Sequence, residues 1–263
     1  MIKLLKIIRI KEWIHFLGVP ILGYFFQFAK VSILDIILII IVGVITLSYG
    51  FVINYWADFS NEYRPIRVLR GVSLLLIPTG LIILTFSFQA YVFWLLTILL
   101  LFLYSFPPFT LKRFPVIVTL VNGFSLASFF IFGFAIQRQV SQSAILFSLF
   151  LGLNLIPLQL IHEWNHKGED LKNNCVSTAS LFSIEVMKII LFSLYFLILI
   201  FAFYISYVTD LNFLFQLVSV IFVISSIFAI SYFNLGGVTC KPRKILKVAG
   251  LIYGVIILAI LIL

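Results

Sequence analysis

Apolar stretches of about 20 residues, the length that a helix needs to cross the hydrocarbon core of a bilayer, follow one another along the chain. Short polar segments separate them, among them the Pro-Pro and Lys-Arg pairs after the fourth span. The pattern predicts an all-α protein with nine membrane-spanning helices. They cover Trp13 to Ala29, Ile33 to Trp56, Val72 to Phe88, Tyr91 to Phe106, Val116 to Ile136, Ala144 to Trp164, Ser180 to Tyr207, Leu211 to Phe233 and Ile245 to Leu263.

Composition supports a multi-pass integral membrane protein. Of the 263 residues, 63% are hydrophobic and only 10% are charged. A soluble domain of this length could not bury so much apolar surface. The spans leave no room for a separate soluble domain, so residues 1–263 are predicted to form a single membrane-embedded domain.

The N-terminal segment does not have the pattern of a cleaved signal peptide. Its basic residues are spread along Met1 to Trp13 instead of preceding a short apolar core, and no small-residue cleavage site follows. With Ile and Leu between the bases, this segment is typical of an amphipathic helix that lies at the membrane surface and leads into the first span.

Positive charge predicts the orientation in the membrane. Of the 18 Lys and Arg, fifteen lie in the N-terminal segment, in the loops after even-numbered spans or, for Lys247, in the first residues of the ninth span. By the positive-inside rule these regions are cytoplasmic, and an odd number of spans puts the C-terminus outside. The net charge of +9 therefore reports topology rather than nucleic-acid binding. The prediction is a multi-pass protein of a prokaryotic plasma membrane, in contact with membrane lipids.

A row of polar side chains marks the cytoplasmic end of the second span. Its members are spaced so that they share one face of a helix, and three arginines follow. The row is Asn54, Asp58, Asn61 and Glu62, and the arginines are Arg64, Arg67 and Arg70. Carboxylates beside arginines suit a phosphate that is bridged by a metal ion. A helix end with capping cations would give the same pattern.

A second polar row lies at a similar depth at the end of the sixth span. Glu163, His166 and Asp170 have helical spacing and would share one face. Ionisable groups at this depth are costly unless they pair or line a cavity. We therefore expect the two rows to face each other across a central cavity of the helix bundle. The alternative is a helix that extends into the cytoplasm with solvated charges.

The same segment also fits a zinc-protease pattern. In His162-Glu163-x-x-His166, two histidines one turn apart would hold zinc and the glutamate would act as a base. An intramembrane zinc metalloprotease is therefore an alternative function.

Four landmarks, in order along nearly the whole chain, resemble the UbiA superfamily of intramembrane prenyltransferases. Arg9-x-x-x-Trp13 resembles the family's entry into the first span, and Asn54-Tyr55-x-x-Asp58-x-x-x-Glu62 its first acidic motif. The Tyr104-Ser105-Phe106-Pro107-Pro108 turn, with Lys112 and Arg113, resembles its basic turn. Glu163-x-x-His166-x-x-x-Asp170, followed by Lys172 and Ser177-Thr178, is similar to its second acidic motif.

The resemblance implies a reaction and a site. Family members bind an isoprenyl diphosphate through Mg²⁺ held by the two acidic motifs, and an aromatic or lipid acceptor attacks the allylic cation left by loss of diphosphate. The resemblance assigns metal-binding and catalytic roles to Asp58, Glu62, Glu163 and Asp170, with His166 as a further metal ligand. It assigns diphosphate binding to Asn54, Arg64, Arg67, Lys112, Arg113, Lys167 and Lys172.

The chain departs from the family pattern in both acidic motifs. Tyr55 and His166 stand where the family has Asp, while Glu62 and Glu163 keep the negative charge. Imidazole is a softer ligand than carboxylate and favours other metals. Three interpretations stay open: a prenyltransferase with a variant metal site, a member that acts on another lipid or acceptor, and a member that binds lipid without catalysis.

Overall fold

The computed structural model describes residues 8–26, 31–58, 63–107, 109–172, 177–209, 211, 213–232 and 241–262. Throughout these ranges the regular structure is helical, with no strand. The nine helices of eight or more residues in this part of the chain confirm the predicted all-α fold. They are α3 (Gly18–Phe25), α4 (Ile33–Asp58), α5 (Tyr63–Phe86), α6 (Phe88–Ser105), α7 (Ile117–Ala135), α8 (Gln142–Lys172), α9 (Ile184–Thr209), α10 (Phe213–Tyr232) and α11 (Lys241–Ile262).

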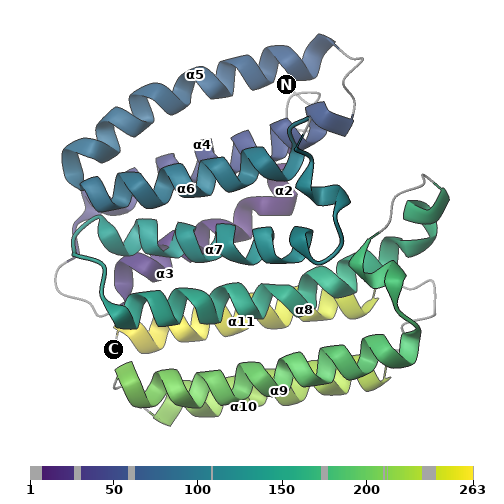
Figure 1. The fold of residues 1–263 in the computed structure, drawn as a ribbon. Coiled ribbons are helices and arrows are strands. Elements are labelled where there is room, and N and C mark those ends of the chain that lie inside the picture. Colours follow the sequence, from purple (N-terminus) through teal and green to yellow (C-terminus); the bar gives the residue numbers. More distant parts are fainter. Residues whose placement is uncertain are drawn as a thin grey trace. The chain divides into compact units, whose positions relative to one another are not determined.

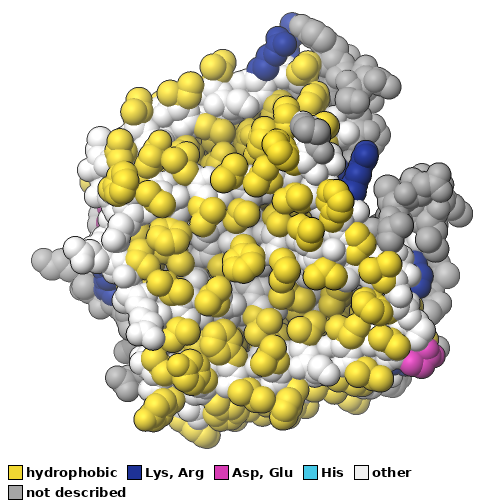
Figure 2. Space-filling model, in the orientation of Figure 1, with side chains coloured by type: hydrophobic (Ala, Val, Ile, Leu, Met, Phe, Trp, Pro, Cys, Tyr) yellow, Lys and Arg dark blue, Asp and Glu magenta, His cyan; other side chains and the backbone are white. Residues whose placement is uncertain are grey.

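Seven of these helices, α4 to α10, are long and apolar enough to span a membrane. The first and last predicted spans correspond to two shorter apolar helical stretches, Ile14–Phe25 and Val248–Leu261. On the face drawn in Figure 2, the described side chains at the surface are largely hydrophobic, as a lipid-facing surface requires. The chain is therefore a multi-pass integral membrane protein.

Two helices extend well beyond their predicted apolar spans. α5 begins at Tyr63 instead of Val72, so Arg67 and Arg70 lie on its first turns and not in a loop. Pro65 is compatible with this start because the first turn of a helix does not need its N–H. α8 continues beyond Trp164 to Lys172. Hydropathy ends at the edge of the membrane, but a helix continues as long as its residues favour it.

The chain forms two compact units. One contains residues 1–112 and 124–144, and the other contains residues 113–123 and 145–263. Within the first unit, α4 packs against α3, α5 and α6, and α5 packs against α6 (Figure 1). Within the second unit, α10 packs against α9 and α11 (Figure 1). The assignment of residues 1–263 to a single domain stays a prediction.

Polar side chains link the helices of the first unit. Trp94 Nε1 on α6 donates a hydrogen bond to Thr46 Oγ1 on α4 at 2.9 Å. Thr97 Oγ1 on α6 and Ser128 Oγ on α7 are also 2.9 Å apart. Hydrogen bonds between helices hold membrane bundles together where lipid provides no hydrophobic driving force.

A second group of polar side chains holds the first turn of α4 in this unit. Asp35 is only 8% exposed, and its carboxylate accepts hydrogen bonds from Gln137 Nε2 and from the Tyr24 hydroxyl. The neighbouring Arg138 donates to the Phe26 carbonyl, and partial burial lowers the pKa of its guanidinium. Asp35 is thus satisfied by partners within the protein.

Two glycines bring α3 and α7 into close contact. A Cβ atom placed on Gly133 would lie 1.9 Å from the Pro20 carbonyl oxygen, and one on Gly23 would lie 2.0 Å from the Phe130 carbonyl oxygen. In both cases the obstacle is backbone, which cannot rotate away as a side chain can. Small residues at such crossings are a common way for membrane helices to approach closely.

We therefore predict that Gly133→Ala destabilises the protein by about 1–3 kcal/mol, because α3 and α7 must move apart to admit the methyl group. The measurement is thermal unfolding in detergent. Gly254→Ala on α11 is the matched control, since a Cβ there meets no atom within 4 Å. It should be neutral or slightly stabilising, because Ala favours the helix. Equal stability of the two variants would contradict the close contact.

Candidate active site

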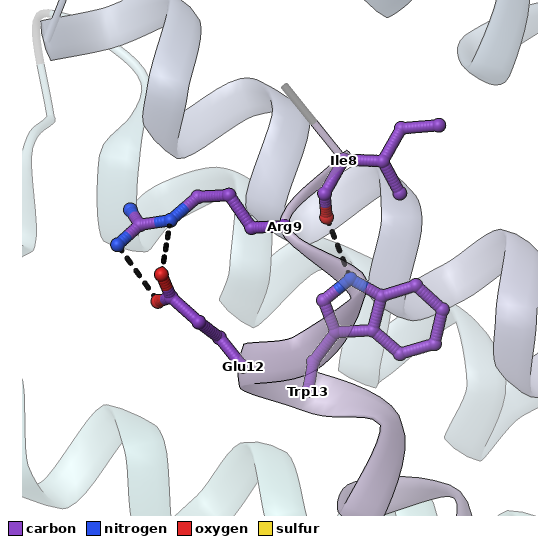
Figure 3. Close-up of polar contacts among 4 residues, drawn as sticks. All are labelled: Ile8, Arg9, Glu12 and Trp13. Atoms are coloured by element: carbon purple, nitrogen blue, oxygen red, sulfur yellow. Dashed lines mark hydrogen bonds and ion pairs between the residues drawn. The ribbon is translucent and has the colours of Figure 1, made fainter. Parts of the chain in front are cut away.

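The entry to the first apolar helix has a defined local structure. Arg9 has φ 55°, the left-handed region, and is the N-cap of the short helix α2 (Ile10–Trp13). Its guanidinium pairs with Glu12 through Nε to Oε1 at 2.8 Å and Nη2 to Oε2 at 2.7 Å (Figure 3). Trp13 is 2% exposed and donates from Nε1 to the Ile8 carbonyl at 2.7 Å (Figure 3). The Arg-x-x-x-Trp landmark therefore fixes the path of the chain into the first helix.

The first polar row meets the basic turn at Asn54. Asn54 lies one turn before the end of α4, and its Oδ1 accepts hydrogen bonds from Lys112 Nζ at 2.9 Å and Ser105 Oγ at 3.0 Å. Ser105 is the last residue of α6, and Lys112 belongs to a short 3₁₀ helix, η2 (Leu111–Arg113). Two landmarks that are about fifty residues apart in sequence thus meet at one point of the first unit.

Three aromatic rings stack on one another where α4 and α6 end. Trp56 stacks on Phe106 with ring centroids 5.6 Å apart, and Phe106 stacks on Phe102 at 4.4 Å. The faces of such rings attract cations. The end of α4 and α6 therefore combines an amide, a lysine and stacked aromatic rings.

Glu163, from the second polar row, lies buried in the second unit. It is 7% exposed, and its Oε1 accepts from Gln159 Nε2 at 3.1 Å and from Thr119 Oγ1 at 3.4 Å. Its Oε2 accepts from the backbone N–H of Ala179 at 3.3 Å. Both oxygens of this buried carboxylate therefore have hydrogen-bond donors within the second unit.

Lys167 lies one turn further along α8. Its Nζ donates to the Phe182 carbonyl at 3.2 Å and stands 4.5 Å from the centroid of the Trp164 ring. Both partners belong to the second unit. Lys167 is therefore engaged with the chain that follows α8.

The remaining predicted site residues are placed only in part. Arg67 on α5 and Arg113 on η2 are exposed. Glu62 lies outside the described residues. For the others the helix is described but the side chain is not: Asp58, Arg64, His166, Asp170 and Lys172. The facing of the two polar rows across a cavity stays a prediction.

Helical structure supports the spacing on which the metal site was predicted. α4 is continuous through Asp58, so Asn54 and Asp58 lie one helical turn apart, and α8 carries the whole second row, from Glu163 to Asp170. Asn61 and Glu62, the other members of the first row, lie outside the described residues. Among the side chains that the structure does describe, no three His, Cys, Asp or Glu lie close enough to hold a metal ion. The donors of the two rows are mainly carboxylates, hard ligands that fit Mg²⁺.

Comparison with known proteins identifies the family. The sequence matches the UbiA prenyltransferase family over residues 16–249. The chain belongs to this family. A search of curated proteins finds no match. The UbiA-family resemblance drawn from the four landmarks is thereby confirmed, and with it the class of intramembrane prenyltransferases.

Solved structures show the same UbiA fold. A UbiA homolog from Archaeoglobus fulgidus bound to Cd²⁺ is 17% identical, with a TM-score of 0.77, over 97% of this chain and 98% of that chain. A UbiA homolog from Archaeoglobus fulgidus bound to GPP and Mg²⁺ is 15% identical, with a TM-score of 0.78, over 98% of this chain and 99% of that chain. A digeranylgeranylglyceryl phosphate synthase is 20% identical, with a TM-score of 0.78, over 98% of this chain and 97% of that chain. The predicted nine-helix bundle architecture is therefore that of a UbiA protein.

Sequence reasoning missed the groups that surround Glu163. Thr119 lies in the apolar span of α7, where a single hydroxyl is common and carries little signal. Gln159 lies one turn before Glu163, and this helical spacing could have suggested the contact. The N–H of Ala179 leaves no trace in a sequence, because every residue except proline has one.

We predict an energetic coupling of about 1–3 kcal/mol between Asn54 and Lys112, because a partly buried hydrogen bond to a charged group joins them and either single substitution removes it. The measurement is a double-mutant cycle of Asn54→Ala and Lys112→Met on unfolding in detergent. Asn54→Ala combined with Arg70→Met, an exposed site on α5, is the control and should be additive. Additivity in both cycles would show that the hydrogen bond between Asn54 and Lys112 does not contribute to stability.

Proposed function

We propose that this UbiA-family protein transfers an isoprenyl group from an isoprenyl diphosphate to an aromatic or lipid acceptor at the cytoplasmic side of the membrane. One observation carries the proposal: Asn54 of the first acidic motif contacts Lys112 of the basic turn. This contact puts a cation beside the first polar row, one turn before α4 ends at Asp58, as a metal-bound diphosphate requires. The structures of the Archaeoglobus fulgidus homolog with GPP or DMAPP and Mg²⁺ support the proposed substrate class.

The metal ligands in this proposal come from the two polar rows without Glu163, whose two oxygens already accept hydrogen bonds within the protein. Asp58, Glu62 and Asp170 are hard oxygen ligands, and His166 is a softer one. When bound there, Mg²⁺ would neutralise negative charge on the diphosphate and make it a better leaving group.

The rest of the site binds and orients the substrate. Lys112 is held beside Asn54, and its flexible ammonium group can turn to a diphosphate oxygen. Further cations for the diphosphate are Arg64, Arg67, Arg113 and Lys172. The stacked rings of Trp56, Phe106 and Phe102 offer faces to an allylic cation and exclude water from it.

The first test is transfer from radiolabelled geranyl diphosphate by the purified protein, with and without Mg²⁺. We expect Asp58→Asn to lower the rate by about 100-fold or more, because loss of one metal ligand removes several kcal/mol of charge stabilisation. Glu185→Gln, the same chemical change at an exposed position of α9, should leave the rate unchanged.

The outcomes separate the alternatives. If the wild type binds geranyl diphosphate in an Asp58-dependent manner but releases no product with any acceptor, it is a lipid-binding member without catalysis. If the wild type neither binds nor reacts, the proposal is wrong.

Zinc analysis tests the metalloprotease alternative. We expect less than stoichiometric zinc in the purified protein, and His162→Ala should keep most of the transferase activity. Stoichiometric zinc that is lost in His162→Ala would instead support a His162-Glu163-x-x-His166 zinc site.

The two native cysteines test the orientation. Cys175 and Cys240 lie in the segments after the sixth and eighth predicted spans, both predicted to be cytoplasmic by their positive charge. We expect a membrane-impermeant maleimide to label them in inside-out vesicles and not in right-side-out vesicles. Labelling from the outer side would reverse the predicted topology.

A further inference from the structure

A short segment after α8, which we call the strap (Ser177–Phe182), is held at both of its ends by α8. Its core is a 3₁₀ helix, η3 (Thr178–Leu181), with Ser177 before it and Phe182 after it. Thr178 is 5% exposed and Ala179 is fully buried. The first turn of the strap is therefore buried within the second unit, while Leu181 near its end is exposed.

Glu163 binds the beginning of the strap. Its Oε2 accepts the hydrogen bond from the Ala179 N–H, while Oε1 is occupied by Thr119 and Gln159. The donors are a backbone N–H and two short or helix-fixed side chains. The Ala179 N–H is fully buried, so it cannot leave Glu163 without becoming an unsatisfied polar group or moving the strap.

Lys167 binds the end of the strap. It lies four residues after Glu163 on α8, and its ammonium group donates to the Phe182 carbonyl at 3.2 Å. The charges match the chain that they contact: the carboxylate meets an N–H at the start of the 3₁₀ helix, and the ammonium meets a carbonyl after its end. This is the arrangement that the dipole of helical backbone favours.

A third contact connects the strap to the start of α7. The Thr178 hydroxyl accepts a hydrogen bond from the Val116 N–H at 2.8 Å. Val116 has φ 66°, an unusual value for a β-branched residue, and must be held in place by its surroundings. Thr119, three residues later, is one of the donors to Glu163. The strap, α7 and α8 thus form one polar cluster.

We infer that Glu163 and Lys167 are positioning residues that clamp the strap to α8, and are not a metal ligand and a diphosphate ligand. The inference rests on the proposed function, in which the remaining carboxylates Asp58, Glu62 and Asp170 hold the metal. The resemblance to the family assigned Glu163 to the metal. The inference departs from that assignment because both oxygens of Glu163 already accept hydrogen bonds from donors within the protein. The role of Glu163 is to fix where the strap and the start of α7 lie at the end of α8 that carries the second acidic motif.

The experiment compares two readouts on the full-length protein in nanodiscs. The first is hydrogen–deuterium exchange of peptides covering 178–183, without substrate or metal. The second is the Mg²⁺ concentration that half-saturates binding of geranyl diphosphate. The variants are Glu163→Gln and Lys167→Met, with Asp170→Asn as a predicted metal ligand and Glu185→Gln as the matched control.

A clamp predicts that strap exchange rises by about tenfold or more in Glu163→Gln and in Lys167→Met, and that Lys167→Arg restores protection. The Mg²⁺ half-saturation should stay within about twofold in Glu163→Gln but rise by about tenfold in Asp170→Asn, whose strap stays protected. A tenfold rise of the Mg²⁺ requirement in Glu163→Gln, with unchanged strap exchange, would overturn the inference in favour of metal ligation.

Two further measurements cover a variant that does not fold and a wild type that binds no substrate. If Glu163→Gln does not fold, Thr119→Val removes one donor to Glu163 and should raise strap exchange in the same direction. If the wild type binds no geranyl diphosphate, the proposed function fails, but strap exchange still decides whether Glu163 and Lys167 form the clamp. Unchanged strap exchange in both Lys167→Met and Thr119→Val would refute it.

Discussion

A polar group inside a bundle of apolar helices has no water to bind, so its hydrogen-bonding partners must come from the protein itself. Asp35, Glu163 and the Trp94 indole all follow this rule, each with a partner on another element. The partners are often distant in sequence, as with Trp94 and Thr46, and each such bond fixes the position of one helix against another. These bonds act together with the close packing at Gly23 and Gly133 to fix how the helices of the bundle lie against one another.

The same constraint explains why the candidate chemistry lies at helix ends. Lys112 and Asn54 meet where α4 and α6 finish, and the clamp between Glu163 and Lys167 lies on the last turns of α8. Charged groups are less costly there than at the middle of a span, because polar chain segments and water are near. The apolar parts of the same helices then hold these ends at defined positions.

The sequence was sufficient for the fold because the length of an apolar run is a direct physical requirement of the bilayer. It was less informative about helix ends: hydropathy does not register that α5 already starts at Tyr63 or that α8 continues to Lys172. The close contact of Gly23 and Gly133 with opposing backbone was also invisible, since a glycine in an apolar span has no pattern of its own. The family landmarks predicted which residues carry the site, but not that Glu163 binds the Ala179 N–H, because a backbone donor cannot be read from residue types.

The two acidic motifs also differ in the kind of partner that their members have. Asn54 is bound by Lys112, a long flexible side chain that can exchange an amide oxygen for a diphosphate oxygen and carry its charge with it. Glu163 is bound by a backbone N–H, which can move only with the whole strap. If Glu163 holds the strap, and Tyr55 and His166 already replace carboxylates, the metal is left with few negative ligands. Such a site would bind Mg²⁺ weakly on its own and would depend more on the cations around Asn54 to hold the diphosphate in place.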